Sequence, residues 1–160
     1  MKILIMGLPG SGKTYLAKRM QPILRAAWYN ADIVREMAND WDFSPEGRIR
    51  QSLRMKNLAD FEKNQGRIVI CDFVCPTRET KKNFNPDITI WMNTIKSGRY
   101  EDTNKMFEIP TEVDYEIIEM NDSNHEIIST KILENVWLEK THCSNAWSMA
   151  TMACRPSRTF

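Results

Sequence analysis

Short runs of apolar residues alternate along this chain with longer segments whose apolar positions recur every three or four residues. Runs of the first kind are typical of strands buried on both faces, and the second spacing is typical of amphipathic helices. The expected strands are 3–6, 26–29, 67–72, 88–92 and 115–118, and the expected helices are 13–25, 33–37, 44–64, 77–84 and 123–139. This alternation predicts an α/β three-layer sandwich around a mostly parallel sheet of about five strands.

Polar residues mark the ends of the predicted helices. Asp32 is the expected N-cap of helix 33–37, and Ser44 followed by Pro45 is expected to open helix 44–64, which Gln65-Gly66 should end. The apolar positions expected on the inner face of helix 44–64 are Ile49, Leu53, Leu58 and Phe61.

The segment 97–112 mixes glycine, proline and charge without a sustained period, so we expect it to form a mobile lid. Residues 1–139 are expected to form a single domain that contains this lid, because a chain of 160 residues fits one ordinary domain. Residues 140–160 show no readable pattern and are expected to form a C-terminal tail.

The charges are balanced, with 22 Lys and Arg against 21 Asp and Glu, so binding to long nucleic acid is not expected. No apolar run approaches the roughly 20 residues that a membrane helix needs. The four cysteines form no CxxC pair and have no histidines at zinc-finger spacing. These features predict a cytoplasmic protein that acts on a small molecule.

The first apolar run leads into a glycine-rich loop that matches the P-loop pattern GxxxxGK[ST] in full. A strand before this loop and a helix after it would let backbone N–H groups point at the phosphates of ATP. Lys13 is expected to bridge the β- and γ-phosphates, and Thr14 to ligate Mg²⁺. The expected nucleotide-binding residues are Gly7, Pro9, Gly10, Ser11, Gly12, Lys13 and Thr14.

Two carboxylates follow predicted strands. Asp32 lies three residues before Arg35, so the pair could take the proton of an acceptor hydroxyl and bind an acceptor phosphate, or could be a helix cap and a surface ion pair. Asp72 ends strand 67–72, where it could hold a Mg²⁺-bound water or cap the following turn. We therefore name Lys13, Asp32 and Asp72 as candidate catalytic residues, and Thr14 and Asp72 as candidate metal ligands.

An aromatic residue, Phe43, precedes a helix whose first turns carry Arg48, Gln51 and Arg54. Such a group could stack on a base and hold its phosphates. The alternative is a hydrophobic staple beside solvated arginines. Position alone does not decide between these two interpretations.

Together these segments resemble the adenylylsulfate kinase family, a family of P-loop kinases, over most of residues 1–120. The segment 30–35 resembles the Asp-Gly-Asp-Asn-Val-Arg motif of that family. Phe43-Ser44 followed by Arg48 resembles its Phe-Ser-x-x-x-Arg segment, and 72–78 resembles its Ile-Ser-Pro-x-Arg region. The compact form is similar to members carried by phages, which would place the protein in the host cytoplasm.

The resemblance implies transfer of the ATP γ-phosphate to the 3′-hydroxyl of adenylyl sulfate, which gives 3′-phosphoadenylyl sulfate. Asp32 and Arg35 would contact this acceptor, Arg48 its phosphosulfate and Phe43 its adenine. Phe107 corresponds to a second aromatic residue that closes from the lid. A homodimer is compatible with the resemblance.

The chain departs from the family pattern at four places. Asn30 replaces the first aspartate of the motif, Gln51 replaces an asparagine, Cys75 replaces a serine, and the stretch 92–100 is shorter than the usual lid. Two rival interpretations therefore stay open. One is a P-loop kinase for another hydroxyl, such as a polynucleotide 5′-hydroxyl or a nucleoside, and the other is a catalytically weakened nucleotide-binding relative.

Overall fold

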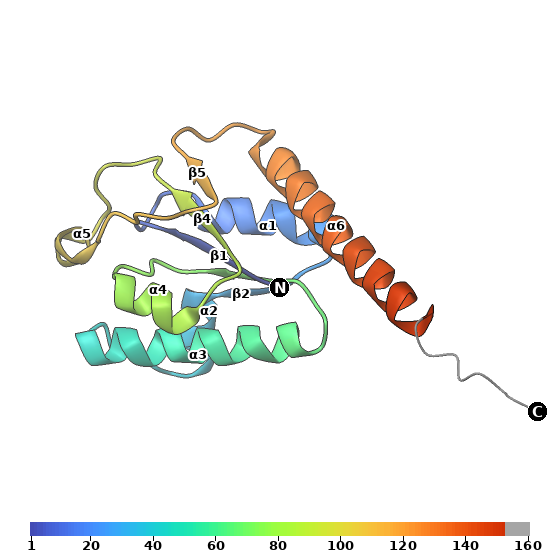
Figure 1. Cartoon of the computed structure of the whole chain (residues 1–160). Helices are drawn as coiled ribbons and strands as arrows, with labels where there is room; N and C mark the ends of the chain where they lie inside the picture. The colour runs from blue at the N-terminus through green and yellow to red at the C-terminus, as the bar shows by residue number, and fades with distance from the viewer. Residues whose placement is uncertain (153–160) are drawn as a thin grey trace, which may run out of the picture.

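The computed structural model describes the backbone of residues 1–152 and the side chains of residues 1–138. Strands and helices alternate along most of the chain (Figure 1). The strands are β1 (Lys2–Gly7), β2 (Ala27–Asn30), β3 (Val69–Asp72), β4 (Ile88–Met92) and β5 (Tyr115–Ile117). The helices are α1 (Lys13–Leu24), α2 (Ala31–Met37), α3 (Pro45–Asn64), α4 (Arg78–Phe84), α5 (Glu101–Met106) and α6 (Asn124–Met152).

The five strands form one sheet in the order β2-β3-β1-β4-β5, and every neighbouring pair is parallel. The central strand β1 is buried along its whole length, as its continuous apolar sequence predicts. Parallel pairing places the carboxyl ends of β1, β2 and β3 at one edge of the sheet. The predicted α/β sandwich with five strands is confirmed.

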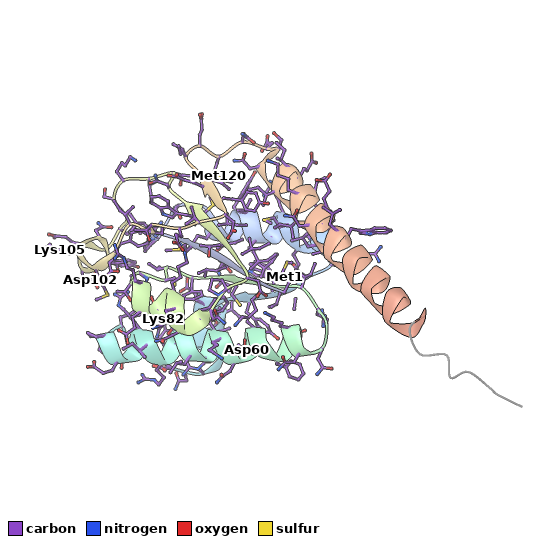
Figure 2. All side chains as sticks on the ribbon, in the orientation of Figure 1. Met1, Asp60, Lys82, Asp102, Lys105 and Met120 are labelled. Carbon is purple, nitrogen blue, oxygen red and sulfur yellow. The ribbon has the colours of Figure 1, made fainter. Side chains whose placement is uncertain are left out.

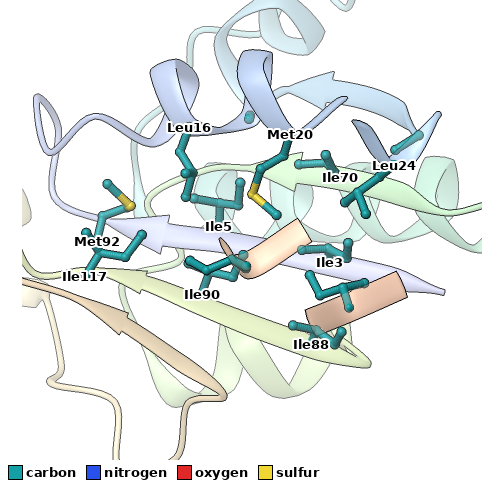
Figure 3. Packing of buried hydrophobic residues seen from close by; sticks show 14 residues of the cluster. Ile3, Ile5, Leu16, Met20, Leu24, Ile70, Ile88, Ile90, Met92 and Ile117 are labelled. Atoms are coloured by element: carbon teal, nitrogen blue, oxygen red, sulfur yellow. The ribbon is translucent and has the colours of Figure 1, made fainter. Parts of the chain in front are cut away.

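Each face of the sheet has its own hydrophobic core. Ile3 and Ile5 of β1 face α1 and α6, where they meet residues such as Met20 and Ile132 (Figure 3). The alternate residues of β1 face α2, α3 and α4, and the residues buried there include Leu4, Met6, Val34, Met55, Ala59 and Phe84. Side chains that alternate across one strand thus build both cores.

Helix α3 buries a face that is only partly the one its apolar pattern predicts. Leu58 packs against the core as predicted, whereas Leu53 and Phe61 are 43% and 62% exposed. The buried positions are Gly47, Gln51, Ser52, Met55, Ala59 and Glu62. Neighbouring backbone comes very close at the start of this face, where a Cβ on Gly47 would lie 2.4 Å from the Asp42 carbonyl oxygen.

Three further predictions about elements need correction. The N-cap of α2 is Asn30, whose side-chain oxygen accepts two backbone N–H groups, whereas Asp32 lies inside the first turn. The segment 97–112 is not entirely a loop, because it contains α5. Helix α6 continues beyond residue 139 to Met152, and the rest of the predicted tail, 153–160, lies outside the described residues.

Within the described residues, no helix is long and apolar enough to span a membrane.

Candidate active site

A cavity of about 820 Å³ opens at the carboxyl ends of the strands. This volume is within the range of roughly 300–1,000 Å³ typical of small-molecule sites. The P-loop, the starts of α2 and α3, the segment after β3 and residues 99–103 all contribute to its lining. Figure 2 shows Asp102 on α5, at the far end of the molecule from α6.

The P-loop connects β1 to α1 with backbone conformations that suit glycine. Gly10 and Gly12 have φ values of 89° and 92°, which a residue with a Cβ rarely adopts. At Gly7 a Cβ would lie 2.7 Å from the Met92 carbonyl oxygen. No side chain caps the N-terminus of α1, so its first N–H groups are available to phosphate oxygens.

The Lys13 ammonium group lies at the cavity and donates a hydrogen bond to the Leu8 carbonyl oxygen at 2.9 Å. Burial lowers the pKa of Lys13 to about 8. The nearby carboxylates of Asp72 and Asp32 raise this pKa, but their effect is smaller than that of burial. A phosphate placed beside this group would favour its charged form.

Asp72 is 2% exposed and accepts hydrogen bonds from three side chains. Thr14 Oγ1 and Asn30 Nδ2 donate to its Oδ2 at 2.7 and 2.8 Å, and Trp28 Nε1 donates to its Oδ1 at 2.7 Å. Burial raises the pKa of Asp72, whereas these three hydrogen bonds and Lys13 lower it. The structure thus places Asp72 directly beside the P-loop hydroxyl.

Asp32 has a different environment from Asp72. Its backbone N–H donates to Asn30 Oδ1, but its side chain is exposed and lines the cavity. Among residues 1–138 its carboxylate has no hydrogen-bond or ion-pair partner. This carboxylate is therefore available to a ligand, whereas that of Asp72 is already hydrogen-bonded.

Two arginines lie close to an aromatic ring at the end of the cavity formed by α2 and α3. The Phe43 ring is half-exposed and lies 4.6 Å from the Arg35 guanidinium and 5.8 Å from that of Arg48. Arg35 is buried and its Nη1 donates to the carbonyl oxygens of Asp40 and Asp42 at 3.0 and 2.9 Å. Arg35 thus shapes the turn before α3 while it lines the cavity.

Gln51 joins two of the helices that line the cavity. Its Nε2 donates to the Ala31 carbonyl oxygen at 3.0 Å, and its Oε1 accepts a hydrogen bond from Arg54. Arg54 also pairs with Asp40 at 2.8 Å. Gln51 therefore ties α3 to the start of α2 in addition to lining the cavity.

The segment of the predicted lid lies close to both α3 and the P-loop. Arg48 Nη2 contacts Asp102 Oδ2 at 2.9 Å, and a Cβ on Gly98 would lie 3.1 Å from the Pro9 carbonyl oxygen. Within the segment, the Gly98 N–H and carbonyl group bond to the Asn104 side chain at 2.7 and 3.1 Å. Phe107 is not brought to the cavity, because it packs against the core cluster beneath α3 and α4. Tyr100 and Arg99 line the cavity instead.

The structure therefore brings most of the predicted site residues to one cavity. Trp28, Arg99 and Tyr100 are among the site residues that the sequence analysis did not single out, although Arg99 and Tyr100 lie within the predicted lid. An aromatic residue or an arginine in a strand or polar loop carries no local signal of function. The residues 1–138 contain no cluster of three His, Cys, Asp or Glu side chains suited to a metal ion. Thr14 and Asp72 are the groups that could hold Mg²⁺ there, together with phosphate oxygens of a nucleotide.

Comparison with known families gives a match over most of the chain. The family model described as "Adenylylsulphate kinase" matches residues 1–124. A probable adenylyl-sulfate kinase from Aeropyrum pernix is 33% identical over 84 residues, and this alignment covers 47% of the chain and 44% of the relative. The matched part is thus less than half of the relative's length.

Solved structures share the fold at low identity. The APS kinase of Mycobacterium tuberculosis, in complex with AMPPNP and APS, has a TM-score of 0.62 and 15% identity, with 83% of this chain and 95% of that chain covered. The shikimate kinase of Acinetobacter baumannii, in complex with shikimate, has a TM-score of 0.53 and 17% identity, with 87% and 94% covered.

Proposed function

Because this chain belongs to the adenylylsulfate kinase family, we propose that it transfers the γ-phosphate of ATP to the 3′-hydroxyl of adenylyl sulfate. The observation that carries this proposal is the half-exposed Phe43 ring close to two guanidinium groups, in the same cavity as Lys13 and the exposed carboxylate of Asp32. An aromatic face can stack on adenine, and arginines can hold an anionic arm.

The two carboxylates take different roles in this proposal. Asp32 has no hydrogen-bond or ion-pair partner among residues 1–138, so it accepts the proton of the acceptor hydroxyl as the oxygen attacks the γ-phosphorus. The bond between the γ-phosphorus and the β,γ-bridging oxygen breaks, and ADP leaves. Asp72 is buried and already accepts three hydrogen bonds, so it is poorly suited to take this proton.

Lys13 and the N-terminus of α1 hold the transferred phosphoryl group in the proposed reaction. Lys13 interacts electrostatically with both carboxylates, and its ammonium group stabilises the charge that spreads over the γ-phosphate oxygens. Thr14 and Asp72 would hold Mg²⁺, which supplies further neutralisation of phosphate charge. We also propose that residues 97–112, with Tyr100 and Arg99, form a lid of one kinase domain.

The test is to incubate the protein with ATP, Mg²⁺ and one acceptor at a time. The acceptors are adenylyl sulfate, AMP, a nucleoside and an oligonucleotide with a free 5′-hydroxyl, and mass spectrometry identifies each product. We expect a phosphorylated product from adenylyl sulfate, and we expect its loss in Lys13→Ala and Asp32→Asn. Phosphorylation of the oligonucleotide or nucleoside alone would overturn the proposed acceptor, and absence of any product would overturn kinase activity.

A further inference from the structure

A polar cluster at the ends of β2 and β3 combines one carboxylate with one neutral amide. Asn30 and Asp72 are paired residues in the register of these two strands, and each ends its strand. The motif that the segment 30–35 resembles has a carboxylate where this chain has Asn30. The carboxylate of this site thus lies on β3, and the neutral amide lies on β2.

The hydrogen bonds of Asn30 require an amide in the arrangement observed. Its Oδ1 accepts from the N–H groups of Asp32 and Ile33 at 3.0 and 3.1 Å. Its Nδ2 donates to Asp72 Oδ2 at 2.8 Å and to Thr14 Oγ1 at 3.1 Å. A carboxylate could keep the two accepted bonds but could donate neither of the others, and its second oxygen would face the charge of Asp72.

Trp28 contributes from the same strand as Asn30. The two residues are two positions apart on β2, so their side chains leave the same face of the strand. The indole N–H of Trp28 donates to Asp72 Oδ1 at 2.7 Å, while Oδ2 accepts from Asn30 and Thr14. Donors on both oxygens restrict rotation of the carboxylate and keep Oδ2 beside the Thr14 hydroxyl.

We propose that the Mg²⁺ site of the P-loop needs one carboxylate and one amide at the paired ends of β2 and β3, and that Trp28 and Asn30 are positioning residues that hold Asp72 toward Thr14. This inference rests on the proposed function only in assuming that the P-loop binds a nucleotide with Mg²⁺. The hydroxyl of Thr14 and one carboxylate then form the protein side of the Mg²⁺ site. Either strand can supply the carboxylate, provided that the other supplies the amide.

The proposal predicts that exchanging the two residues preserves the site. Asp72→Asn leaves two amides, Asn30→Asp leaves two carboxylates, and the double variant Asn30→Asp/Asp72→Asn restores one of each. The readout is the affinity for ADP, measured by calorimetry with Mg²⁺ and without it. The ratio of the two affinities reports how much Mg²⁺ strengthens ADP binding. The Asp72→Asn variant should lower this ratio by about 10- to 100-fold. Losses of this size follow when a group that supports a metal ion is replaced. The exchange should restore most of the ratio.

Trp28→Phe tests the positioning role with a smaller change. Phenylalanine keeps an apolar ring but lacks the indole N–H, so the Mg²⁺-dependent ratio should fall by about tenfold while affinity for ADP alone is unchanged. The matched control is Trp91→Phe on β4, because Trp91 packs against the core and lies outside the cavity. This control should leave the ratio unchanged.

Two results would overturn the proposal. One is a folded double variant whose Mg²⁺ ratio is as low as that of Asp72→Asn. The other is a Trp28→Phe variant that matches Trp91→Phe, and this comparison holds even if the double variant fails to fold. None of these measurements includes an acceptor. These ADP measurements therefore stay valid when adenylyl sulfate proves not to be the acceptor. When they contradict the positioning role, the acceptor assay can still be interpreted.

Discussion

Lys13 and Arg35 line the cavity, and each already donates hydrogen bonds to backbone carbonyl oxygens. Lys13 donates to a carbonyl oxygen of its own loop, and the Arg35 guanidinium is committed to two carbonyl oxygens of the turn before α3. One N–H of the Lys13 ammonium is used in this way, and two remain to donate to a phosphate. The Arg35 guanidinium also lies 4.6 Å from the Phe43 ring centroid.

We expect nucleotide binding to be coupled to protonation of Lys13. Burial lowers the pKa of free Lys13 to about 8, and phosphate oxygens should raise it again. The ADP affinity should then be fully present below pH 8 and should fall as the pH rises above it, by at most about tenfold per pH unit for one proton. Calorimetry at pH 9 in buffers of different ionisation enthalpy should show uptake of nearly one proton.

Lys13→Met should abolish this proton uptake, whereas Lys18→Met on the exposed side of α1 should retain it. Equal uptake in the Lys13→Met variant would show that another group is responsible.

Phe43→Ala should weaken acceptor binding without affecting the nucleotide. Its ring is 51% exposed and faces the cavity, so its loss removes a stacking surface worth about 1–3 kcal/mol, or roughly 5- to 150-fold in affinity. Calorimetry with adenylyl sulfate in the presence of ADP and Mg²⁺ measures this change. The control is Phe61→Ala, since Phe61 is on the outer side of α3 and does not line the cavity. Wild-type acceptor affinity in Phe43→Ala would argue against the stack.

At the scale of elements, α5 and α3 are joined by a contact through Arg48, which lines the cavity and belongs to the proposed acceptor site. Arg48 donates to the Phe43 carbonyl oxygen through Nε and to Asp102 and Thr103 of α5 through Nη2. The guanidinium that is expected to meet the phosphosulfate is thus paired with a carboxylate of the lid. Asp102 itself is 66% exposed on its side chain.

We expect Asp102→Asn to strengthen the binding of an anionic acceptor. The acceptor anion must displace Asp102 from Arg48, and an exposed ion pair is worth about 0.2–1 kcal/mol, so the gain should be roughly 1.5- to 5-fold. The effect should shrink at high salt.

Glu101→Gln is the matched control, because Glu101 lies on the same helix but pairs with Lys105. Weaker acceptor binding in Asp102→Asn would show that the carboxylate contributes to the acceptor site instead of competing for it.

For the whole molecule, the last described helix completes one face of the fold. Helix α6 begins at residue 124, yet Ile128 and Ile132 lie in the same core cluster as Ile3 and Ile5 of the first strand. Figure 1 shows α6 beside α1 and extending beyond the sheet. The family match ends where α6 begins, so this part of the core is supplied by residues outside the match.

Ile132→Ala should destabilise the protein by about 2–5 kcal/mol, because Ile132 is fully buried and its loss leaves a cavity. Urea unfolding followed by circular dichroism measures the change. Ile127→Ala, on the same helix at 51% exposure, should cost less than about 1 kcal/mol. Similar costs for both variants would show that α6 is not packed as described.

The local sequence determined most of the fold and the donor half of the site. The apolar runs of β1, β3 and β4 indicated buried parallel strands, and the spacing of Gly7, Gly12 and Lys13 indicated a phosphate-binding loop between strand and helix. These features depend on residues that are near one another in the chain. Hydrophobic periodicity and glycine conformation are therefore sufficient to predict them.

Only the tertiary structure decided which side chains meet. The helical period predicted that Phe61 is buried, but periodicity does not tell which backbone approaches a helix. The family resemblance implied that Phe107 closes on the cavity, whereas it packs against the core. Asp72 receives hydrogen bonds from Trp28 and Asn30, which lie 44 and 42 positions away in the chain. Their distance depends on the pairing of β2 with β3, and the sequence alone cannot show that an amide on one strand supports a carboxylate on the other.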